Sequence, residues 1–233
     1  MKRNTWISAA LLALVVAPAT EADFLTLTGT SETWSSPLSN PSPTFTVGVY
    51  DTTVTGTSQI PLFGWTLGLE IVPESGAVGT VDFATATIPT TNYLLGANSL
   101  GLLPAPTLPA TTIPTIADAD GDPVGSGVLV PTTGANLLAL TFSASGGAQG
   151  VFDILATPYD TSTNTPTSGD GSSWGDANAN QYNYSNFSPT APVPVVLGTL
   201  TIPAVMSAVP EPGSALLVLL AAGPMAWFVR RRR

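Results

Sequence analysis

The sequence contains no cysteine and no histidine, and only six of its 233 residues are basic. Without cysteine there can be no disulfide bonds, and without histidine as well the usual zinc and copper ligands are missing. Serine and threonine are plentiful, but between residues 23 and 209 no histidine or lysine is present to activate one as a nucleophile. We therefore expect a protein that is not an enzyme.

Positive charge is confined to the two ends of the chain. The basic residues are Lys2, Arg3, Arg230, Arg231, Arg232 and Arg233, whereas thirteen of the fifteen acidic residues lie between residues 23 and 209. Phosphate binding requires lysine or arginine, so nucleic acid is excluded as a partner of this acidic body. Salt bridges cannot form within the body, and its stability must come from burial and hydrogen bonding.

Each end of the chain carries an apolar segment. Residues 1–22 have a positively charged start, an apolar run over 6–16 and small residues in "APATEA", the pattern of a signal peptide cut after Ala22 or Ala19. Residues 213–229 are uncharged, and at 1.5 Å per residue they would span about 26 Å as a helix. They predict a transmembrane helix, with the arginine cluster 230–233 as a stop-transfer signal. The alternatives are a buried core helix and a permanent membrane anchor.

Between these segments the dominant pattern is alternation of apolar and polar residues. In "FGWTLGLEI" the residues Phe63, Trp65, Leu67, Leu69 and Ile71 share one face, and six further segments, "FLTLTG", "TFTVGVY", "TVDFATA", "LLALTFSAS", "GVFDILA" and "VVLGTLTI", behave similarly. Such segments, with Gly, Pro and Asn between them, predict an all-β fold. We expect one antiparallel β-sandwich over 23–208, Ig-like or a jelly roll, flanked by the signal helix and the transmembrane helix. Residues 89–126 and 158–192 interrupt the pattern as long loops.

The end of the chain has three parts in a fixed order. Pro210, Glu211 and Pro212 precede the apolar helix, and the arginine cluster follows it. Segment 209–233 resembles the PEP-CTERM sorting signal. The resemblance implies that an exosortase recognises the Pro-Glu-Pro motif and removes the helix after a transient membrane insertion. It also implies export to the cell surface or extracellular (biofilm) matrix of a Gram-negative-type bacterium that produces exopolysaccharide.

The body resembles a cohesin-like, carbohydrate-binding-type sandwich. The stretch "FTVGVYDTTVTGTSQIPLFGWTLGLEIVPESGAV" is similar to its early strands, and "NLLALTFSASGGAQGVFDILA" is similar to its later hairpin. The Asp-Pro turn of that family is Val72-Pro73 here, so the role of its aspartate does not carry over. Dockerin binding is not inferred.

Two groups of residues are candidates for binding. Asp118, Asp120 and Asp122 in "DADGD" offer carboxylates at alternate positions, the ligand type that Ca²⁺ prefers. Pro123 and Leu129 stand where an EF-hand needs Gly and Glu, so the alternatives are a looser Ca²⁺ site and a solvated turn.

The second group consists of Trp174, Tyr182 and Tyr184 in the Gly/Asn/Ser-rich loop. Their rings could stack on sugars. The alternative is that they anchor the loop to the sandwich.

The sequence thus predicts an exported surface or matrix protein that acts as a non-catalytic, polysaccharide-associated or adhesive module. One alternative is a purely structural matrix protein without a specific ligand. Another is a glycoside hydrolase that uses a carboxylate pair such as Glu70 and Glu74, although nothing in the sequence marks the two as a pair. No cofactor other than Ca²⁺ is expected.

Overall fold

The computed structural model describes residues 25–35, 37, 40–52, 59–122, 125–159, 171–188 and 193–204. The chain divides into two compact units, Met1–Pro203 and Ala204–Arg233, and all the described strands belong to the first. The predicted signal peptide (1–22) and sorting signal (209–233) lie outside the described residues. Among the residues that are described, no helix is long and apolar enough to cross a membrane.

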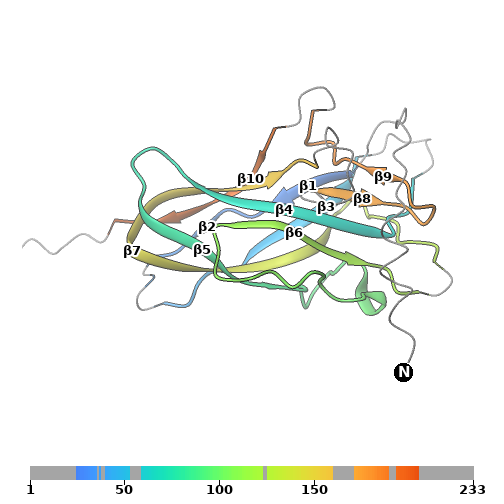
Figure 1. The fold of residues 1–233 in the computed structure, drawn as a ribbon, viewed down its shortest axis with the longest axis horizontal. Helices are drawn as coiled ribbons and strands as arrows, with labels where there is room; N and C mark the ends of the chain where they lie inside the picture. The colour runs from blue at the N-terminus through green and yellow to red at the C-terminus, as the bar shows by residue number, and fades with distance from the viewer. Residues whose placement is uncertain are drawn as a thin grey trace, which may run out of the picture. The chain divides into compact units, whose positions relative to one another are not determined.

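The described residues of the first unit form β-strands and one short 3₁₀ turn, η1 (Gly96–Asn98) (Figure 1). The strands are β1 (Leu25–Gly29), β2 (Glu32–Thr33), β3 (Phe45–Asp51), β4 (Gly64–Pro73), β5 (Val78–Thr87), β6 (Thr112–Ala119), β7 (Ala135–Thr157), β8 (Ser173–Gly175), β9 (Gln181–Tyr182) and β10 (Val195–Ile202). The all-β prediction is confirmed. The pairs are antiparallel except that β2 runs parallel to β10, so the sandwich is not purely antiparallel.

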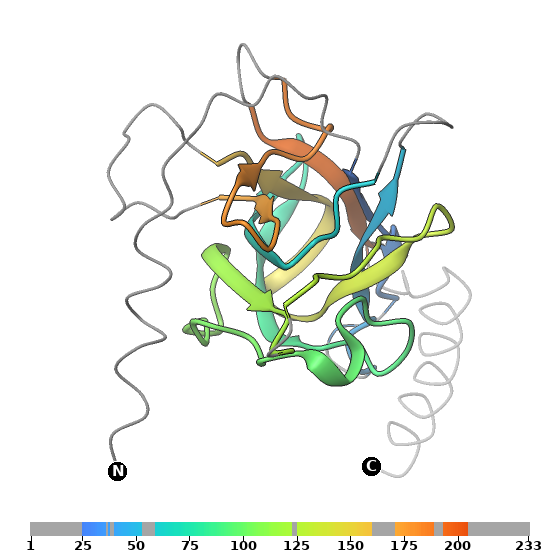
Figure 2. The same ribbon diagram turned by 90° about the vertical axis from the view of Figure 1, so that its right-hand side faces the viewer.

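Two layers face each other and share strand β7. One layer has the order β1-β3-β7-β5, through the first part of β7. The other has β4 at its centre, with β6 on one edge and the second part of β7 on the other, followed by β10 and β2. Where β7 ends, β8 continues along the same edge of β4 and pairs with β9 on its outer side. Figure 2 shows the two layers end-on.

The hairpin that the resemblance implies over "NLLALTFSASGGAQGVFDILA" is wrong, because β7 is one strand of 23 residues. It bends instead of turning back: Gly146, Gly147 and Gly150 have φ of 64°, 66° and 114°, backbone that residues with a side chain rarely adopt. The strand stays paired through the bend, since Gln149 still faces Val78 of β5 and Gly150 faces Ile202 of β10. The glycines let one strand pass from one layer to the other.

The loops predicted over 89–126 and 158–192 contain three strands. β6 was missed because Pro114 interrupts its pattern and a proline cannot donate to a ladder. The structure accommodates it with a bulge: Ile113 faces Leu69 and Ile116 faces Leu67, so two residues of β6 have no direct partner on β4. β8 and β9 are too short to show a periodicity.

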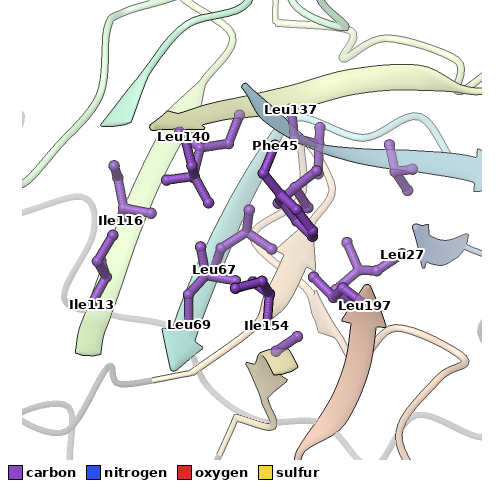
Figure 3. Close-up of a cluster of buried hydrophobic side chains, with 14 of the residues drawn as sticks. Leu27, Phe45, Leu67, Leu69, Ile113, Ile116, Leu137, Leu140, Ile154 and Leu197 are labelled. Carbon is purple, nitrogen blue, oxygen red and sulfur yellow. The ribbon is translucent and has the colours of Figure 1, made fainter. Parts of the chain in front are cut away.

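The core lies between the two layers. The alternation of β4 is confirmed, with Trp65, Leu67, Leu69 and Ile71 all buried, whereas Phe63 precedes the strand and is half-buried. Figure 3 shows Phe45 with leucine and isoleucine side chains of both layers in this core. That ring packs edge-on against Phe142 at a centroid distance of 6.3 Å. The inner faces therefore interdigitate as expected of a sandwich.

Candidate functional site

A row of four side chains crosses the second layer near one end of the core. Asp118 of β6 faces Trp65 of β4, Trp65 faces Trp174 of β8, and Trp174 faces Tyr182 of β9. Direct cross-strand partners project to the same side of a sheet, and Trp65 projects with Leu67 toward the core. We call these four residues the transverse row. It brings together two candidate groups that are far apart in the sequence.

Asp118 is held at the end of this row by donors from the protein itself. The hydroxyls of Tyr93 and Ser99 both donate to its Oδ2, and the Ala119 backbone N–H donates to Oδ1 at 2.7 Å. The carboxylate is only 4% exposed. No basic residue occurs in the body, so hydrogen bonds rather than a counter-charge compensate its burial.

Tyr93 joins the two layers through this contact. Its backbone pairs with Asn136 at the start of β7, in the first layer, while its hydroxyl reaches Asp118 in the second. Burial raises the pKa of Tyr93, and the hydrogen bond and negative charge of Asp118 raise it further; Trp65 and Ser99 act weakly in the opposite direction. The Trp65 indole N–H is nevertheless not aligned for a hydrogen bond with any described residue. The tyrosine is therefore a neutral donor at physiological pH.

The three aspartates predicted as Ca²⁺ ligands do not converge. The carboxylate of Asp118 already accepts the three hydrogen bonds given above. Asp120 is buried, and its Oδ1 accepts a hydrogen bond from the Asp122 backbone N–H at 3.0 Å. Within the part of the chain that the structure describes, no three Asp, Glu, His or Cys side chains form a group that could hold a metal ion. Asp120 and Asp122 lie beyond the end of β6, and Asp122 is half-buried. A Ca²⁺ site on these aspartates stays a prediction.

The three aromatic residues of the predicted sugar-binding loop also lie inside. Trp174 is 4% exposed and Tyr184 is 0% exposed, whereas Tyr182 is half-buried and stacks on Trp174 at a ring-centroid distance of 4.3 Å. Two of the three rings therefore cannot reach a sugar. Of the two readings of the sequence, the geometry favours the one in which these rings anchor the loop.

The segment 171–188, which carries these rings, closes the side of the sandwich between the two layers; we call it the strap. Next to its first strand, the Ser172 hydroxyl accepts from Gly68 N–H at 3.1 Å and donates to the Gly68 carbonyl, where β7 stops and β8 begins. Near its end, the Asn186 side chain accepts from Leu27 N–H at 2.6 Å and donates to the Leu27 carbonyl at 3.0 Å. One amide group thus takes the place of a neighbouring strand at the edge of β1.

The turn between β8 and β9 is organised by one carboxylate, Asp176. It accepts hydrogen bonds from the backbone N–H of Asn178, from the backbone and side chain of Asn180, and from the Tyr182 hydroxyl. Burial alone would raise the pKa of Asp176, but these hydrogen bonds outweigh it and the pKa lies below its ordinary value. The aspartate is therefore ionised and acts as a structural acceptor.

The carboxylate pair considered for glycoside hydrolysis receives no support. Glu70 is on the outer side of β4, and Glu74 is exposed just beyond the end of the strand. Four residues of extended chain place their Cα atoms about 13 Å apart, which gives no indication of two facing carboxyl groups.

Sequence reasoning missed several residues that matter here. Asn186 and Ser99 gave no signal, because their partners are distant in sequence. Asp176 could have been found, since Asp and Asn two residues apart in "DANAN" are typical of a turn closed by a side chain. Pro210, Glu211, Pro212 and the arginines 230–233 lie outside the described residues, and their roles stay predictions.

No family model and no curated protein matches the chain. Among solved structures, it is similar to cohesin modules. One is the sixth cohesin of scaffoldin B from Acetivibrio cellulolyticus, in complex with a dockerin, at 10% identity and a TM-score of 0.44 over 78% of this chain and 99% of that one. Another is a type I cohesin–dockerin complex from Clostridium thermocellum, at 11% identity and a TM-score of 0.46 over 80% and 98%. A third is the cohesin module of a family 33 glycoside hydrolase from Clostridium perfringens, at 9% identity and a TM-score of 0.42 over 78% and 98%. A likeness at this level carries no argument about what the chain binds.

Proposed function

We propose that the protein is an exported, non-catalytic β-sandwich that serves as a structural or adhesive component of the cell surface or extracellular matrix. One observation carries the proposal. The side chains that the sequence suggested for a ligand site, Asp118 and the rings of Trp174 and Tyr184, are buried, and Asp118 joins the two layers through Tyr93. The hydrogen bonds of these polar side chains stabilise the sandwich.

The composition supports the same conclusion. The body lacks histidine, cysteine, lysine and arginine, so general-base, nucleophilic and anion-binding machinery is largely missing. Its adhesive role would then depend on its surface rather than on a pocket. Two of the similar structures are cohesin–dockerin complexes, but the proposal does not rest on them.

Export and processing form the second part of the proposal. Residues 1–22 direct the chain out of the cytoplasm, and an exosortase cuts at Pro210, Glu211 and Pro212 while helix 213–229 is in the membrane. The prolines keep the scissile region extended, which is the form that proteases bind. The intact mass of the protein recovered from outside the cell should correspond to a chain that begins near Asp23 and ends near Pro212. A mature form that still carries Arg230 to Arg233 would favour a permanent anchor.

The non-catalytic role is tested on the producer's own polysaccharide. The purified protein is incubated with that material, and both retention and the release of new reducing ends are measured. We expect no release, and turnover would overturn the proposal. Retention without turnover would identify the polysaccharide as the adhesive partner, and absence of retention would leave the structural role.

A further inference from the structure

Four aromatic side chains follow one another across the end of the second layer at which β8 and β9 lie (Figure 1). Tyr182 stacks on Trp174 at a ring-centroid distance of 4.3 Å, and Trp174 is the direct partner of Trp65 on strands about 4.8 Å apart. The Tyr93 hydroxyl donates to Asp118, which is the direct partner of Trp65 on its other side, and Trp65 is close enough to influence the pKa of Tyr93. We call Tyr93, Trp65, Trp174 and Tyr182 the aromatic path. Its two tryptophans are buried and its two tyrosines are half-buried.

Each tyrosine at an end of the aromatic path has a carboxylate as its hydrogen-bond acceptor. The Tyr93 hydroxyl donates to Asp118 Oδ2, and the Tyr182 hydroxyl donates to Asp176 Oδ2 at 3.1 Å. A phenol that loses an electron becomes a strong acid, and its proton can pass only to a base within hydrogen-bond reach. Both tyrosines therefore have the acceptor that they need to lose an electron and a proton together.

The charges around the aromatic path favour the loss of an electron from its rings. Asp118 and Asp176 are 4% and 7% exposed, and no lysine, arginine or histidine occurs between residues 23 and 209 to neutralise them. A negative charge in a poorly solvated site attracts a neighbouring positive charge more strongly than it would in water. The radical cation that forms when an indole loses one electron is therefore stabilised at Trp65 and Trp174.

Few other side chains of the body compete for oxidation. Cysteine is absent, and Met1, Met206 and Met225 all lie outside the described residues. Where thiols and thioethers are missing, tryptophan and tyrosine are the side chains that lose an electron most readily. The third tryptophan among the described residues, Trp34, is also buried, but its indole N–H donates to the Asn40 carbonyl and it forms no ring pair with a described aromatic residue. It is a reference outside the path.

We propose that the aromatic path is a route for one-electron oxidation, which transfers the oxidising equivalent from Trp65 and Trp174 to the tyrosines at its ends. An inorganic radical such as azidyl takes one electron from an indole and leaves as azide. The indole radical cation then takes an electron from one of the tyrosines, while the phenolic proton moves to the aspartate that is bonded to it. The products are an intact tryptophan, a neutral tyrosyl radical and a neutral carboxylic acid, so that charge is conserved. The inference is independent of the proposed function, since it rests on ring geometry, hydrogen bonding and charge.

Pulse radiolysis tests the proposal on the protein isolated from its producer. Azidyl radicals are generated in a short pulse, and the visible absorption bands of the tryptophan and tyrosyl radicals are followed in time. We expect the tryptophan band to decay as the tyrosyl band rises, with a rate constant that does not depend on protein concentration. The absence of a tyrosyl rise, or a rate constant proportional to protein concentration, would overturn the proposal.

Two phenylalanine variants locate the transfer. Tyr182→Phe keeps a ring on Trp174 but cannot form a tyrosyl radical, and it should slow the conversion at least threefold. Tyr50→Phe is the matched control, because Tyr50 is also half-buried but lies on β3 in the first layer, and it should change the rate constant less than twofold. Equal effects of the two substitutions would show that the aromatic path is not the route.

Peptide mapping by mass spectrometry provides a second measurement, the position of permanent damage after longer exposure to the same oxidant. Trp34 and Trp174 are 5% and 4% exposed, so direct attack should be similar at the two residues. In the wild type we expect oxidised Trp174 to be at least threefold less abundant than oxidised Trp34. Tyr182→Phe should remove this difference and Tyr50→Phe should retain it, with thermal melting to verify that each variant keeps the fold. Equal damage at the two tryptophans of the wild type would overturn the proposal.

Discussion

Two tyrosines of this fold lose the same atom on substitution by phenylalanine and should respond with opposite signs. The hydroxyl of Tyr93 donates to the buried carboxylate of Asp118. The hydroxyl of Tyr184 is fully buried and has no hydrogen-bond partner among the described residues. Comparing the two substitutions therefore isolates how much a hydrogen-bond partner contributes to the free energy of unfolding, because both change the apolar area by a similar amount.

The magnitudes follow from these environments. A hydrogen bond to a charged group contributes about 1.5–3 kcal/mol, and Asp118 keeps two other donors, so Tyr93→Phe should lower the free energy of unfolding by about 2 kcal/mol. Burying an unpartnered hydroxyl costs about 1–3 kcal/mol, so removing it in Tyr184→Phe should raise the free energy of unfolding by about 1 kcal/mol.

Urea unfolding at pH 7 measures both values, provided that the slope m is the same for the wild type and the variants. In a thermal melt, 1 kcal/mol corresponds to roughly 2–4 °C for a domain of this size. A loss of stability in Tyr184→Phe would refute the reasoning, since it would mean that the hydroxyl has a partner. So would a neutral Tyr93→Phe, which would mean that Asp118 does not need the third donor.

The same tyrosines predict the behaviour at high pH. Burial raises the pKa of Tyr184, and burial together with Asp118 raises that of Tyr93. A group whose pKa is raised by folding stabilises the fold fully below its unfolded pKa, near 10 for tyrosine, and this contribution is lost as the pH rises further. The free energy of unfolding should therefore fall above about pH 10, and each phenylalanine variant should reduce that slope.

Three further outcomes are expected from melting experiments. Asn186→Asp should destabilise the fold by about 2 kcal/mol, because it replaces the amide donor to the Leu27 carbonyl with a carboxylate. Asn186→Ala should show a smaller loss. An unchanged melting temperature for both variants would mean that the hydrogen bonds of Asn186 to the edge of β1 do not stabilise the fold. Gly68→Ala should lower the free energy of unfolding by about 1–3 kcal/mol, since a Cβ there would meet the Thr157 hydroxyl and lie 2.9 Å from the Pro114 carbonyl oxygen. An unchanged melting temperature would show that the backbone at the junction of β7 and β8 can move apart. Among the described residues no three acidic side chains form a group that could hold a metal ion, so Ca²⁺, Mg²⁺ and NaCl at matched ionic strength should raise the melting temperature equally, by screening alone. A larger shift with Ca²⁺ would show a specific Ca²⁺ site.

The sequence by itself determined the class of fold and the inner face of most strands. Alternation is a local property, since successive side chains of a strand project to opposite sides, and it placed Trp65, Leu67 and Leu69 in the core without knowledge of any partner. The expectation of no nucleic-acid partner and no catalysis likewise came from the sequence alone, since it rests on the absence of histidine and basic residues from the body. The prediction failed where a local signal was ambiguous: the glycines of "GGAQG" fit a turn as well as a bend, and Pro114 fits a loop as well as a bulge.

Only the tertiary structure decided what the polar side chains do. Asp118 and Trp174 come from stretches that looked like exposed loops, and they became an internal row because β6 and β8 flank β4 in a particular register. Asn186 meets Leu27 across 159 residues, and Tyr93 meets Asp118 across 25. Such contacts depend on which strands pair and by how many residues they are shifted, and a shift of one residue would direct strand residues such as Asp118 and Trp174 to the opposite face.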